Sequence, residues 1–162
     1  MLTSDILAKA RSHWMEGQPL EAGQLIFESL PSEIRPQWAN NILRSVVERT
    51  GIKSEVIHRV ISTADCSDEW GKAHDVFSAV RDKTLQVDQW GPHPQRTLLL
   101  CHLVLAELVA KVTYNATNPP DEFDEDSGWF IAPCLKDILD LVGDQALSEA
   151  MWSVLCLDEV CG

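Results

Sequence analysis

Apolar residues recur along most of the chain at intervals of three and four, which places them on one face of an α-helix. This spacing predicts seven or eight helices joined by short loops. Among them are a helix over 20–30 that ends at Pro31, a third helix for which Gly51 is the expected stop, and a fifth helix that starts at Ser67 or Asp68. A helix over 133–142 is followed by a turn at Gly143, and Asp144 caps a last helix that runs to Leu157. Only residues 84–90, TLQVDQW, leave room for one short strand.

The segment 95–114 differs from the other predicted helices because it is hydrophobic nearly all round. A helix of this kind should lie at the centre with other helices on several sides. Its apolar run, 98–110, is too short to span a bilayer and contains His102 and Glu107. The sequence therefore predicts an all-α fold, a compact bundle or short stack of seven to eight helices around this central helix.

Residues 7–31 have the small and aromatic positions of two antiparallel helices, with Gly17 between them and Ala22 five residues later. No second copy follows at the period that a repeat protein needs. We expect generic helix packing, with helical pairs stacked in sequence order. The whole chain, 1–162, is expected to form a single domain with an acidic loop at 115–132.

The net charge of −12 is concentrated in the last quarter of the chain. Residues 1–118 contain 14 acids and 12 bases, whereas residues 119–162 contain 11 acids and one base, Lys136. Such a surface repels nucleic acid and anionic membranes and attracts basic partners. We therefore expect a basic protein partner, with no nucleic acid and no membrane. Solubility alone is the competing explanation for the charge.

The five cysteines are an odd number with no closely spaced pair, and the N-terminal residues lack the apolar core of a secretory signal. Reduced thiols in a cytoplasmic protein are the expectation.

The acidic run 121–126 resembles a calcium-binding loop in part. Glu122, Asp124 and Asp126 alternate as the ligands of such a loop do. However, Gly128 falls at the seventh position instead of the sixth, and the twelfth position is Pro133, which has no carboxylate. The pattern excludes an EF-hand and leaves only a loose, low-affinity cation site as an alternative.

Other cofactor and metal motifs are also missing from the sequence. There is no glycine-rich phosphate loop, no closely spaced pair of zinc ligands and only one Glu-x-x-His pair, Glu55 and His58, where a helical di-metal site needs two. No cofactor and no metal are predicted.

The sequence leaves an enzyme open as an alternative. Its site would assemble around the central helix from His93, Cys101, His102 and Glu107. Cys134 follows Pro133 at a predicted helix start, which favours a thiolate, but its acidic surroundings oppose one. A structural subunit of a larger assembly is the third alternative, and the sequence does not predict the oligomeric state.

The favoured hypothesis is a non-enzymatic protein-binding module, such as an immunity-type inhibitor of a basic toxin or an adaptor. Its partner-binding residues would be acidic side chains that steer the partner, together with aromatic anchors. These candidates are Asp121, Glu122, Asp124, Glu125, Asp126, Trp129, Phe130, Asp137 and Asp140. Trp129 has two interpretations, an exposed anchor at the interface or a side chain that fastens the loop onto the helices.

Overall fold

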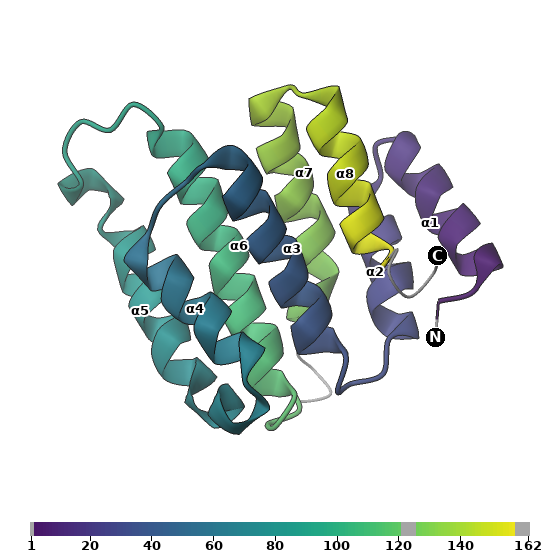
Figure 1. Ribbon diagram of the computed structural model, residues 1–162, viewed down its shortest axis with the longest axis horizontal. Helices are drawn as coiled ribbons and strands as arrows, with labels where there is room; N and C mark the ends of the chain where they lie inside the picture. Colours follow the sequence, from purple (N-terminus) through teal and green to yellow (C-terminus); the bar gives the residue numbers. More distant parts are fainter. Residues whose placement is uncertain (1, 121–125, 158–162) are drawn as a thin grey trace.

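The computed structural model describes residues 2–120 and 126–157, and these residues form eight α-helices and no strand (Figure 1). The all-α fold with seven to eight helices is confirmed. The helices are α1 (Ser4–Met15), α2 (Pro19–Ser29), α3 (Arg35–Thr50), α4 (Glu55–Asp65), α5 (Ala73–Leu85), α6 (Arg96–Asn115), α7 (Ile131–Val142) and α8 (Gln145–Leu155). Three 3₁₀ turns join them, η1 (Ser67–Lys72), η2 (Val87–Gln89) and η3 (Ser127–Phe130).

The helices are arranged in two layers. Figure 1 shows α4, α3 and α8 in front, with α5, α6, α7 and α2 behind them. The α1 helix closes the end of the stack, packed on α2 and reaching α8 through the rings of Trp14 and Trp152, whose centroids are 5.5 Å apart. Each helix thus buries its apolar face between neighbours in its own layer and the facing layer.

The helices do not stack in sequence order, so this expectation is wrong. The last two helices, α7 and α8, lie between the α1–α2 hairpin and the α3–α6 pair. Small residues allow the insertion: a Cβ atom on Gly23 of α2 would lie only 2.8 Å from the Cβ of Ala132 in α7. Because glycine has no Cβ atom, α7 can approach the α1–α2 hairpin closely at this position.

The α6 helix is the central helix, as the hydrophobic pattern predicts. It contacts α3, α4, α5 and α7, and Leu103, Leu105 and Ala106 are completely buried. By length and composition alone, α6 would qualify as a membrane span. Half of its apolar window is buried inside the fold, as in the core helix of a globular domain.

Local sequence signals fix several helix ends. The side chain of Asp144 accepts hydrogen bonds from the amides of Ala146 and Leu147 and so caps α8, as expected. Gly51 and Gly143 end α3 and α7 in the left-handed conformation, with φ of 73° and 70°. Glycine is favoured there because a Cβ atom would be strained.

Two local expectations are wrong. Residues 84–90 form no strand: they finish α5 and enter η2, and the indole of Trp90 donates to the carbonyl of Lys83 at 3.0 Å. The fifth helix begins at Ala73 because residues 67–72 form η1, which the indole of Trp70 ties to the carbonyl of Ala64. In both contacts an indole N–H donates to a backbone carbonyl in the last turn of a helix, where carbonyls lack a partner within the helix. Helix propensity along the sequence does not predict such contacts.

Candidate functional site

The acidic loop contains most of the acidic side chains predicted to bind a partner. Asp121, Glu122, Asp124 and Glu125 lie outside the described residues. Asp126 begins the described part, where its side chain accepts a hydrogen bond from the amide of Gly128 at 3.3 Å and caps η3. Asp126 therefore has a structural role at the start of the turn that leads into α7.

The turn that follows is packed onto α2. Gly128 is buried, and a Cβ atom there would lie 2.1 Å from the ring of Phe27. Trp129 and Phe130 are half-buried, and Trp129 packs against the core. This geometry favours the second interpretation of Trp129, a side chain that fastens the segment to the helices.

The remaining acidic candidates line the outer side of α7. Asp137, Asp140 and Asp144 are exposed. Asp137 and Asp140 are three residues apart and lie on one side of α7. Asp144 follows the left-handed Gly143 that ends this helix, and it is the N-cap of α8. Leu141 lies beside Asp137 and Asp140 on α7 and is 51% exposed. We call Asp137, Asp140, Leu141 and Asp144 the α7 surface.

The three carboxylates of the α7 surface are not equally available. Lys136 pairs with Asp140 one turn away, and Asp144 is engaged in capping α8. No cation among the described residues forms an ion pair with Asp137. The negative charge of Asp137 is thus the least compensated of the three.

A further carboxylate of the acidic quarter lies elsewhere. Glu149 is on α8, in the other layer, and both of its oxygens accept from the guanidinium of Arg11 at 3.1 and 3.2 Å. The same guanidinium lies 4.9 Å from the ring centroid of Trp152. The acidic quarter therefore does not form one continuous surface, because Glu149 is neutralised by a base from α1.

The structure does not bring the four enzyme candidates together. Glu107 pairs with Arg81 of α5 at 3.2 Å. His93 lies in the loop before α6, whereas Cys101 and His102 lie on α6 and point in different directions because consecutive helical residues are about 100° apart.

His102 is completely buried and acts in the core. Because a carbonyl oxygen can only accept, the Nδ1 atom, 2.7 Å from the carbonyl of Leu98, carries a proton. The Nε2 atom lies 2.9 Å from the hydroxyl of Thr50, which also reaches the carbonyl of Val46 at 2.7 Å. Burial lowers the pKa of His102, and hydrogen bonds to backbone carbonyls oppose this effect. The imidazole links α3 to α6.

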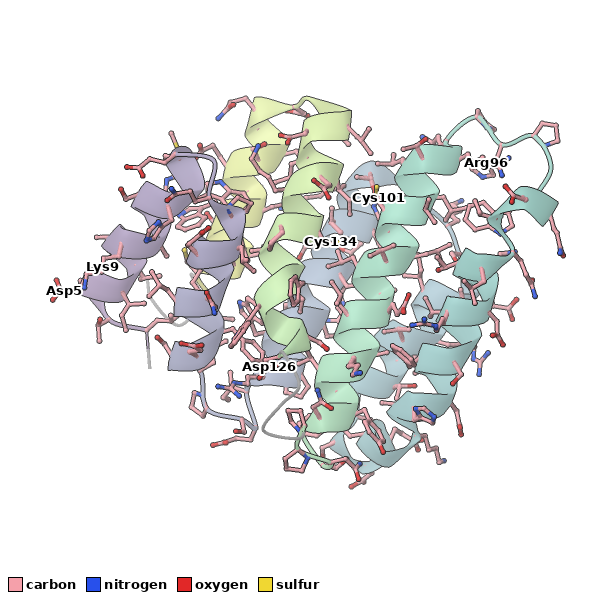
Figure 2. The ribbon with its side chains drawn as sticks, turned by 180° about the vertical axis from the view of Figure 1, so that it is seen from behind. Asp5, Lys9, Arg96, Cys101, Asp126 and Cys134 are labelled. Carbon is pink, nitrogen blue, oxygen red and sulfur yellow. The ribbon has the colours of Figure 1, made fainter. Side chains whose placement is uncertain are left out.

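Two cysteines meet where α6 and α7 pack, as Figure 2 shows from behind. The Sγ atom of Cys134 lies 3.7 Å from the carbonyl oxygen of Cys101. Burial, the neighbouring Cys101 and Asp137 raise the pKa of Cys134 to about 12, and burial together with Asp137 raises that of Cys101. A thiolate nucleophile is disfavoured at both positions.

The sequence reasoning missed a cavity at one end of the stack. It has a volume of about 620 Å³ and lies between the C-terminal ends of α3 and α7 and the N-terminal end of α6. Its walls carry Arg49, His93 and Arg96 together with apolar side chains. The lining residues come from parts of the chain that are far apart. From the sequence, only His93 and Arg96 could have been placed in one site, because both lie near the start of α6.

No cluster of three or more metal-ligating side chains occurs within residues 2–120 and 126–157. Comparison of the chain with protein-family models, with curated proteins and with solved structures finds no match in any of the three.

Proposed function

We propose that this protein is a non-enzymatic protein-binding module that docks a basic protein through the α7 surface. The observation that carries the proposal is the pair of exposed carboxylates on α7, Asp137 and Asp140, with the exposed Leu141 beside them and Asp144 just beyond the end of the helix. An acidic rim steers a basic partner and raises the association rate, while an apolar centre loses water on contact and supplies affinity.

The charge distribution supports the same conclusion. The segment 119–162 contains a single base, Lys136, and that base lies on α7 itself. Of the α7 carboxylates, Asp137 has no ion-pair partner among the described residues and is free to meet a cation from another protein. An immunity-type inhibitor that covers a basic toxin is one concrete form of such a module, and an adaptor is another.

The packing around the core supports binding in preference to catalysis. The four enzyme candidates do not share one site: His102 and Glu107 make contacts within the fold, and His93 and Cys101 lie elsewhere. The interior around the completely buried Leu103 is closely packed. A catalytic site needs its groups within hydrogen-bonding reach of one substrate atom.

The proposal is tested by capture of partners on the immobilised full chain at low and at high salt, with mass spectrometry of the bound proteins. We expect a basic partner that is retained at low salt and released by high salt. The variant Asp137→Asn with Leu141→Ala should lose this partner. The carboxylates of 121–126 are tested in the same way by alanine substitution.

The matched control is Asp75→Asn with Asp82→Asn, which removes two exposed carboxylates from α5 and leaves the α7 surface intact. Retention of the partner by the control and its loss by the α7 variant would support docking at α7. Equal retention by both variants, or binding that ignores ionic strength, would overturn the proposal.

A further inference from the structure

The cavity between the ends of α3, α6 and α7 has an unusual charge for this protein. The chain has 25 acidic and 13 basic side chains, yet the lining includes Arg49 and Arg96, with His93, and no acid. From α7 the lining takes only Leu141 and Val142. A positively charged cavity in a strongly acidic protein indicates a preference for an anion.

The two guanidinium groups are available to different degrees. Arg96 donates to the carbonyl of Val87 at 2.7 Å and pairs with Asp88, whose side chain is 97% exposed and well screened by water. Arg49 is exposed and has no hydrogen bond or ion pair to any residue in 2–120 or 126–157. Its donors are free to bind an anionic group in a bidentate manner.

Further donors surround the same place. The Nδ1 atom of His93 accepts from the amide of Gln95 at 3.1 Å, so the proton of a neutral ring lies on Nε2 and remains available. Gln95 provides no side-chain cap for α6, and the amides of Thr97 and Leu98, both in the lining, have no partner among the described residues. Unpaired amides of this kind complement the guanidinium groups.

The lining also contains apolar side chains. Leu141 and Val142 of α7 are 51% and 38% exposed, and Pro94 and Leu98 near the start of α6 line the same cavity. Two large apolar side chains are thus left in contact with water beside a cluster of cations. A ligand that covers both features must have an anionic head and an apolar body.

We propose that this cavity binds a small amphipathic organic anion, with a carboxylate or similar head at Arg49 and a short hydrocarbon chain against Leu141 and Val142. The volume of about 620 Å³ lies within the range of small-molecule sites and accommodates a chain of several carbons. Leu141 belongs both to this lining and to the α7 surface. The two proposals are tested separately, because Arg49 lines the cavity and is not part of the α7 surface.

The test is a titration of the ¹⁵N-labelled full chain with sodium octanoate, followed by amide chemical shifts. We expect saturable shifts at Thr97 and Leu98 and at residues 141–142. Octylammonium has the same chain with a cationic head and should not bind there. Arg49→Gln should weaken octanoate binding about tenfold, because it removes one charge-assisted contact.

Arg59→Gln is the matched control, because Arg59 is also an exposed helical arginine, on α4 and outside the cavity lining. The amide spectrum itself reports whether each variant is folded. Equal binding of octanoate and octylammonium, equal affinities of the two arginine variants, or shifts located away from the cavity would each overturn the proposal.

Discussion

The indole N–H of Trp38, in α3, donates to the carbonyl oxygen of Leu155, at the end of α8, with a distance of 2.9 Å between the two heavy atoms. The two residues are 117 positions apart, and Trp38 is completely buried. The last carbonyls of a helix have no partner within it, so this contact satisfies a group that would otherwise be buried without one. It joins the inserted α8 to α3 in the same layer.

Trp38→Phe should lower the free energy of unfolding by about 2–4 kcal/mol, because it removes both a buried hydrogen bond and part of a core side chain. Urea unfolding followed by circular dichroism measures the effect. Trp70→Phe provides the comparison: its indole also donates to a helix-end carbonyl, that of Ala64, but the residue is half-buried. A loss at Trp38 no larger than at Trp70 would contradict this account.

Gly128→Ala should destabilise the protein by about 1–3 kcal/mol, because the added methyl group would overlap the ring of Phe27. When Phe27→Leu is combined with Gly128→Ala, it should recover part of this loss. A double-mutant cycle of unfolding free energies measures the recovery. Gly71→Ala is the control, since a Cβ atom there meets nothing within 4 Å. Additive losses for Gly128 and Phe27 would argue against packing of η3 on α2.

The buried His102 should make stability dependent on pH. Its pKa is lower in the folded protein than in the unfolded chain, where it is about 6.5. The unfolded state therefore binds the proton more readily, so the contribution of neutral His102 is complete above pH 6.5 and declines as the pH falls toward the folded pKa. The slope from this residue is at most about 1.4 kcal/mol per pH unit.

Urea unfolding between pH 7.5 and 5.5 measures this slope. The change in unfolding free energy over this range should be smaller for His102→Gln than for the wild type, whereas His58→Gln should match the wild type because His58 is exposed on α4. Parallel pH profiles for wild type and His102→Gln would show that the imidazole does not titrate between the two states.

The thiols should differ in reactivity. Cys66 is exposed, whereas burial holds the pKa of Cys134 at about 12, so Cys134 has almost no thiolate at neutral pH. Iodoacetamide labelling of the native protein at pH 7.5, followed by peptide mass spectrometry, should modify Cys66 and leave Cys134 unmodified until urea unfolds the chain. Early labelling of Cys134 would show that α6 and α7 separate in the native state.

The periodicity of apolar residues was sufficient to predict the helical class, the number of helices and the central position of α6. These properties depend on the local spacing of apolar residues and on the need of each helix to bury its apolar face. Every packed arrangement of the helices must meet that need. The cap at Asp144 and the helix ends at Gly51 and Gly143 were predicted for the same reason, because their chemistry lies within a few residues.

Only the tertiary structure decided which helices lie next to one another and what they leave between them. The insertion of α7 and α8 beside α2 depends on the fit of Gly23 to Ala132 and of Gly128 to Phe27, contacts between residues about a hundred positions apart. The cavity with Arg49 and Arg96 arises in the same way, from three helix ends that meet only after packing. Steric fit between distant residues has no period in the sequence, so apolar spacing predicted the elements of this protein and tertiary packing determined its surfaces.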